Sequence, residues 1–166
     1  RLVAFNFKNT ETNGFELFLQ TERNFFDFRL SASKILACDL SEKETVKIIP
    51  HSPEYIVNLN FGLTLFHYTR VFFDSRYKSK IFRDRDNLIS NDESLIFDGG
   101  FNYSLKAHQE NLSLSFLCTN IFNQDKIRLK SYNGTNEISG MQARSDIDGY
   151  PLAGREFKLS MQVDFS

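Results

Sequence analysis

The sequence predicts an all-β fold made of about eight antiparallel strands, which form a segment of a larger transmembrane β-barrel. Apolar and polar residues alternate with period two along most of the chain, and the connections between these stretches alternate between short and long. The clearest stretch is Arg155–Phe165, which is about as long as a tilted strand that crosses a bilayer. One of its sides is apolar and the other polar: Phe157, Leu159, Met161, Val163 and Phe165 oppose Lys158, Ser160, Gln162 and Asp164.

Composition restricts the function only loosely. The 166 residues are 41% hydrophobic and carry a net charge of −1, so the clustered basic excess of a nucleic-acid-binding protein is missing. No apolar run reaches the ~18 residues of a transmembrane helix, and no signal peptide opens the chain. Because the alternation starts with the first residues, we expect the chain to be a fragment whose N-terminus is mature or cut.

The first half of the chain contains three predicted strands. Leu2–Lys8 alternates and is followed by Asn9–Gly14, a stretch of turn-forming residues that we interpret as a connection. Phe15–Gln20 and Phe25–Ala37 are the next two strands. Leu40–Pro53 follows as a longer loop that contains two prolines.

The second half repeats this scheme with five more strands. Those strands are Tyr55–Leu65, Arg70–Phe82, Leu95–Leu105, Leu112–Phe116 and Arg155–Phe165. Polar loops at Arg83–Glu93 and Gln124–Gly154 separate some of them, and short turns near His67 and at Ala107–Glu110 separate the others. One face of the fifth strand is strongly charged and is predicted to line a barrel lumen; it comprises Arg70, Asp74, Arg76, Lys78 and Lys80.

The connections sort by length in a way that is typical of outer-membrane barrels, which have short periplasmic turns and longer extracellular loops. The short turns near Arg23, His67 and His108 all fall at one end of the predicted sheet. Aromatic residues gather near both ends, as in two interfacial girdles. The periplasmic group is Phe25, Phe26, Phe66, Tyr68, Phe101, Tyr103 and Phe165, and the outer group is Tyr55, Phe82, Phe122 and Phe157.

The order of several short motifs resembles the C-terminal part of TonB-dependent outer-membrane receptors over nearly the whole chain. The motifs are Asn13-Gly14-Phe15-Glu16, Ile49-Pro50-His51-Ser52-Pro53, Asp74-Ser75-Arg76-Tyr77, Asn120-Ile121-Phe122-Asn123 and Gly154-Arg155. In the family these correspond to a strand entry, a proline loop, an R-Y segment, an N-L-F-D/N signature and the start of the last strand.

The resemblance implies that residues 1–166 are the last eight strands of the family's barrel, and that the plug domain lies outside this chain. It also implies a location in the bacterial outer membrane and energy-coupled transport of a scarce ligand such as a ferric siderophore, cobalamin or a glycan. The implied partners are that ligand, the lipid bilayer and the inner-membrane energy-coupling complex, which acts through the plug; no nucleic acid is expected.

The residues do not indicate an enzyme, and we predict no catalytic, cofactor-binding or metal-binding residue. His51, His67 and His108 lie in loops or turns without a nucleophile motif. Asp84 and Asp86 alternate as in a calcium loop, but the glycine and the terminal glutamate of such a loop are missing.

Two further predictions remain. Cys38 and Cys118 are far apart in the sequence and are expected to be unpaired small hydrophobic residues, although a disulfide is possible in an oxidising compartment. The alternative to a receptor fragment is a stand-alone eight-stranded barrel, either a structural or adhesive outer-membrane protein or a soluble lipocalin-like carrier.

Overall fold

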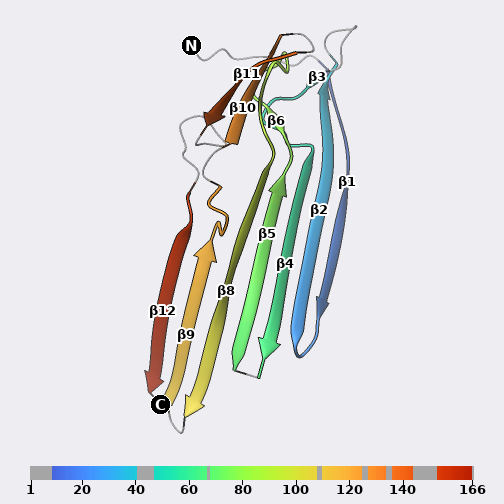
Figure 1. The fold of residues 1–166 in the computed structure, drawn as a ribbon. Helices are drawn as coiled ribbons and strands as arrows, with labels where there is room; N and C mark the ends of the chain where they lie inside the picture. Colours follow the sequence, from blue (N-terminus) through green and yellow to red (C-terminus); the bar gives the residue numbers. More distant parts are fainter. Residues whose placement is uncertain are drawn as a thin grey trace.

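The computed structural model describes residues 9–40, 47–66, 68–107, 110–124, 127–133, 136–143 and 153–165. In this part of the chain every regular element is a β-strand, and the strands form two antiparallel sheets (Figure 1). The all-β prediction is therefore confirmed for the described residues. The first predicted strand, residues 2–8, lies outside them.

The larger sheet contains seven long strands in the order β1-β2-β4-β5-β8-β9-β12, with the short β3 paired to the end of β2. The strand bounds are β1 Thr10–Glu22, β2 Phe26–Asp39, β3 Lys47–Ile48, β4 Tyr55–Leu65, β5 Thr69–Lys78, β8 Ser94–Ala107, β9 Glu110–Thr119 and β12 Glu156–Phe165. Neighbouring long strands are all antiparallel.

The smaller sheet is built from the connections at one end of the larger sheet (Figure 1). Its order is β11-β10-β7-β6, with β6 Ile81–Phe82, β7 Ile89–Asn91, β10 Ile127–Asn133 and β11 Asn136–Ala143. We call this end of the larger sheet the loop end and the opposite end the turn end. At the turn end, β1 and β2, β4 and β5, and β8 and β9 are joined by short connections, as predicted.

The start of the larger sheet corrects one prediction. Residues 9–14 do not form a turn, because residues 10–14 are already part of β1 and pair with residues 35–39 of β2. Gly14 suits this ladder because a Cβ at its position would meet the carbonyl oxygen of Lys34. Close strand pairing thus outweighs a local composition that favours turns.

The predicted strand at residues 70–82 is in fact two strands in different sheets. Main-sheet pairing of β5 ends at Lys78, and Ser79 then caps β4: its backbone N donates to the carbonyl oxygen of Tyr55 (2.9 Å), and its hydroxyl accepts from the Tyr55 backbone N (3.0 Å). Phe82 and Ile81 pair with β7 in the smaller sheet. Phe82 therefore lies at the loop end on β6 rather than on β5, and Lys80 does not belong to the charged face of β5.

Strands also form inside two stretches predicted as loops. Residues 83–93 contain β7, and residues 124–154 contain the β10–β11 hairpin, which pairs with β7. The loop at residues 40–53 contains β3. The three long connections are thus partly ordered by pairing with each other and with β2.

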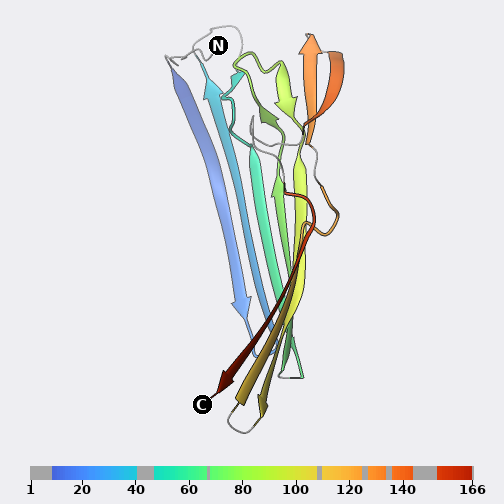
Figure 2. The same ribbon diagram turned by 90° about the vertical axis from the view of Figure 1, so that its left-hand side faces the viewer.

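The larger sheet is a single curved layer without a closed end-to-end ladder among the described residues (Figure 2). Only four hydrophobic residues of the described part are buried, namely Ala37, Cys38, Ile81 and Cys118, and all four lie toward the loop end. The edge strands β1 and β12 each have one neighbour in this sheet, and their arrows point in the same direction (Figure 1).

Candidate functional site

The larger sheet has one continuous apolar face, because its register places apolar residues opposite one another from strand to strand. One row of directly paired residues crosses six strands and consists of Phe26, Leu63, Val71, Phe101, Phe116 and Leu159. Rings on this face contact each other, as Phe101 and Phe116 do at 5.7 Å between centroids. Large side chains of the face are open to solvent, including Phe15 (61% exposed) and Leu159 (69%). A patch this large on a soluble monomer would be unusual.

The opposite face is polar and contains ion pairs between strands. Arg70 on β5 donates two hydrogen bonds from one guanidinium nitrogen to both oxygens of Asp27 on β2, at 2.7 and 2.9 Å. Gly62 on the intervening β4 makes this diagonal pair possible, because a Cβ there would come within 2.7 Å of a carboxylate oxygen and 2.8 Å of the guanidinium. Arg76 pairs with Asp98 at 2.6 Å. Arg70, Asp74, Arg76 and Lys78 therefore share one face, as predicted.

The polar face is hollowed. A cavity of about 660 Å³ lies at its turn end and is lined by residues that include Gln20, Glu22, Asp27, Arg29 and Arg70. A second cavity of about 250 Å³ lies farther along β1, β2 and β4, beside Glu16, Phe18, Ser31, Ser33 and Asn58. Both cavities are lined mainly by residues of the polar face, so this face is concave where they lie.

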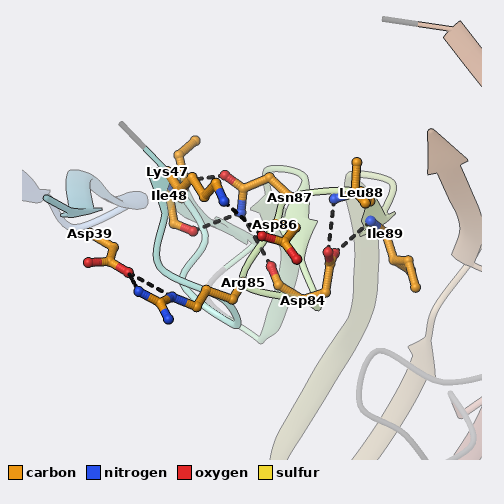
Figure 3. A network of polar contacts seen from close by, with 9 residues as sticks. All are labelled: Asp39, Lys47, Ile48, Asp84, Arg85, Asp86, Asn87, Leu88 and Ile89. Carbon is orange, nitrogen blue, oxygen red and sulfur yellow. Dashed lines mark hydrogen bonds and ion pairs between the residues drawn. The ribbon is translucent and has the colours of Figure 1, made fainter. Parts of the chain in front are cut away.

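Three consecutive residues clasp the β6–β7 connection to the β2–β4 connection (Figure 3). The side-chain amide of Asn87 donates to the carbonyl oxygen of Ile48 and accepts from its backbone N, both at 2.8 Å, so it takes the place of a strand. Arg85 donates to the carboxylate of Asp39 at 2.9 Å, and Asp39 is only 3% exposed. We call Arg85, Asp86 and Asn87 the clasp.

Asp84 and Asp86 serve this connection and do not face one another across a metal site. Asp84 accepts from the backbone N of Leu88 and Ile89, at 3.0 and 2.6 Å, and so closes the turn. Asp86 lies 2.7 Å from the ammonium of Lys47, whose hydrogen bond lowers the pKa of the Asp86 carboxyl below its ordinary value. Among the described residues there is no group of His, Cys, Asp or Glu that could hold a metal ion.

Two motifs noted in the sequence meet at the start of β12. The side-chain oxygen of Asn123 accepts from the backbone N of Arg155 (2.8 Å), and the Asn120 amide donates to the carbonyl oxygens of Gln124 (3.1 Å) and Ala153 (2.9 Å). Asn120 also accepts from the Gln124 backbone N at 2.8 Å. We call Asn120 and Asn123 the latch. Both have positive φ, 49° and 53°, which asparagine tolerates better than most residues.

The latch also connects to the polar face. The Asn120 backbone N donates to Asp98 at 2.7 Å, and Asp98 is the ion-pair partner of Arg76. Beyond the latch, the Arg155 guanidinium lies over the ring of Phe157, 5.7 Å from its centroid. The sequence pointed to both motifs but not to their contact, since they are about thirty residues apart. For Asn87, the only signal in the sequence was the cluster of turn-forming residues around it, which indicates a turn but not a contact with Ile48.

The remaining predicted residues are spread out. His51 is exposed and has a positive φ of 62°, whereas His67 and His108 lie outside the described residues. Cys38 on β2 and Cys118 on β9 are free and buried, and β4, β5 and β8 lie between their strands. The prediction that the two cysteines are unpaired is therefore confirmed, and the possible disulfide is excluded. Among the aromatic residues, Phe101 pairs with Val71, the third residue of β5 counted from its turn end.

Comparison of the chain with models of known protein families gives no match, and comparison with curated proteins gives none either. The described part of the chain has no helix long and apolar enough to cross a membrane.

Proposed function

We propose that this chain forms part of the barrel wall of a TonB-dependent receptor in the bacterial outer membrane. Such a receptor takes up a scarce ligand, for example a ferric siderophore, cobalamin or a glycan, with energy supplied from the inner membrane. The observation that carries the proposal is the continuous apolar face on one side of an antiparallel sheet with a charged, hollowed face on the other. The order of the five sequence motifs is the reason for proposing this family.

The dimensions of the apolar face suit an outer membrane. β4 has 11 residues, and its apolar side runs from Tyr55 to Leu65. Steps of about 3.3 Å per residue give a length of about 33 Å along the strand. A strand tilted by about 40° then covers about 25 Å along the membrane normal, which is the height of the apolar band in outer-membrane barrels.

The polar character of the concave side favours a polar lumen rather than a lipocalin-like interior. A lipocalin-like carrier needs its apolar residues inside the barrel and polar residues outside. Here the cavities lie on the polar face, which bears Asp27, Arg70 and Arg76. Arg or Lys side chains that face lipid at the bilayer midplane would cost roughly 2–4 kcal/mol each, so a lumen is the favourable side for this face.

The two edges support a wall that is completed by other strands. In a sheet of seven strands in which every pair of neighbours is antiparallel, the two edge strands β1 and β12 run in the same direction. Direct closure of β1 on β12 would therefore need a parallel pair, whereas bacterial single-chain barrels have an even number of antiparallel strands. An odd number of further strands restores that pattern. An unpaired edge in lipid would cost several kcal/mol for each exposed backbone group.

A facing experiment tests the membrane part of the proposal. Fluorescent probes are attached to single cysteines at Phe73 and Arg76 of the natural protein in membranes, with Cys38 and Cys118 replaced by alanine. We expect a lipid-soluble quencher to reach the probe at Phe73 and not the one at Arg76, because the two positions lie on opposite faces of β5. Quenching at Arg76 alone would reverse the faces, and quenching at neither position would remove the sheet from the bilayer.

Transport is tested in cells that express the natural protein. Uptake of a labelled iron chelate, cobalamin or oligosaccharide should stop when the inner-membrane proton gradient is dissipated, because the proposed receptor depends on inner-membrane energy. Uptake that persists without the gradient would point to a passive pore. A protein that supports no uptake but passes the facing experiment would favour the structural outer-membrane protein.

A further inference from the structure

We propose that the long connections at the loop end move as one body, and that the clasp joins them. The body consists of β3, β6, β7 and β10 with residues 48–51 and 83–89, and we call it the platform. This inference concerns the mechanics of the connections and goes beyond the proposed transport function. Three joins, each between segments far apart in the sequence, support it.

The first join is made by Asn87. Its amide uses both a donor and an acceptor on the backbone of Ile48, at 2.8 Å each, although the two residues are 39 positions apart. Such a pair has the hydrogen bonding of a strand neighbour, so β3 lies between β2 on one side and a side chain on the other. Asn87 lies in the turn that Asp84 closes, and its φ of 57° directs its side chain toward Ile48.

The second join is the contact between Arg85 and Asp39 (Figure 3). The side chain of Asp39 is 4% exposed and that of Arg85 is 27% exposed, so the pair is largely shielded from water. Breaking a buried pair leaves an uncompensated charge, which is strongly unfavourable. The pair therefore resists separation of the β6–β7 connection from the end of β2. Lys47 and Asp86 add an exposed ion pair beside it.

The third join is continuous backbone pairing. The His51 backbone N donates to the carbonyl oxygen of Phe82 (2.8 Å), and the Arg83 backbone N donates to that of Ile89 (2.9 Å). β7 then pairs with β10 through residues 89–91 and 129–131. Hydrogen bonds thus run without interruption from β2 to the hairpin of the last long connection. A force that displaces one connection is transmitted to the others.

Amide hydrogen exchange of the natural protein, purified in detergent from membranes, tests the inference. Asn87→Gly removes the side chain and keeps a residue that accepts positive φ. The amides of Ile49, His51 and Arg83 report on the platform, since none of them bonds to Asn87 itself. In a single cooperative body, protection at all three falls by a similar factor, about thirtyfold for two lost hydrogen bonds.

Two controls accompany this measurement. The amide of Ser104, which donates to Tyr68 at the turn end, should not change, and Asn58→Ala on the polar face should leave the platform amides as they are. Loss of protection at Ile49 alone, or at none of the three amides, would show that the connections move independently. Arg85→Gln breaks a different join and should reproduce the common loss. If Asn87→Gly does not fold, Arg85→Gln alone decides between a common and a local effect.

Discussion

Removing the side chain of Asn120 should detach the start of β12. The amide makes three hydrogen bonds, two to Gln124 and one to Ala153, and the residue is only 4% exposed. Of the three bonds, the one to Ala153 joins Asn120 to the segment that leads into β12, so at about 1 kcal/mol per bond Asn120→Gly should make opening of that segment easier by about 1 kcal/mol. Asn120→Ala should add about 1 kcal/mol, because alanine is disfavoured at the positive φ of this position.

Amide exchange along β12 measures this opening in the natural protein purified from membranes. A change of about 1 kcal/mol corresponds to roughly a fivefold loss of protection, since each 1.4 kcal/mol is a factor of ten. We expect this loss at Arg155 and at the first residues of β12, and a larger loss for Asn120→Ala. Amides in the centre of β4 should not change, and Asn58→Ala, which loses one bond of 3.3 Å to Ser31, serves as the matched control.

The register of β12 supplies a second readout. Ser115 on β9 and Ser160 on β12 are directly opposite each other, so cysteines at these positions should form a disulfide on mild oxidation when Cys38 and Cys118 are absent. Asn120→Ala should lower the yield of this disulfide. Unchanged exchange and an unchanged yield in both Asn120 variants would refute the role of the latch.

Two further predictions concern the two faces of the sheet. Leu59→Arg should reduce the folded fraction in membranes by an amount equivalent to about 2–4 kcal/mol, whereas Asn60→Arg on the polar face should be tolerated. The amount of heat-modifiable protein in membranes measures both effects. Equal effects would contradict the assigned faces. Gly62→Ala should push Asp27 away from Arg70 and lower the free energy of unfolding by about 1 kcal/mol, which the denaturation midpoint measures. The same substitution in an Asp27→Ala background should lower the free energy of unfolding by less. Equal costs in both backgrounds would mean that the glycine does not serve this pair.

Alternation predicted the long strands because each residue of a two-faced sheet has one of only two environments. Tyr55–Leu65 was predicted with the bounds that β4 has, since its neighbours β2 and β5 continue both faces without interruption. Residues 10–14 were missed because turn-forming residues are also accepted in a strand that a neighbour holds in place. Their partners in β2 lie some 20 to 30 positions later, and local composition carries no information about them.

The short strands and the candidate site were out of reach of the sequence for a related reason. β6 and β7 have two and three residues, too few for a period to be recognised. Asn87 acts on Ile48, and Asn123 acts on Arg155 through a backbone in the left-handed region. Both contacts depend on how distant connections meet above the sheet, which periodicity does not specify. What the sequence did provide was the position of the motifs that contain Asn123 and Arg155.

The latch and the charged face form one connected structure. Asp98 accepts from Arg76 on the polar face and from the Asn120 backbone N at the loop end, so one carboxylate serves both. Asn120 in turn holds Ala153, two residues before Arg155. An anionic group brought close to Arg76 on the concave side would compete with Asp98 for the guanidinium. The start of β12 is thereby linked, through Asn120 and Asp98, to the charged side chains on the polar side of the sheet.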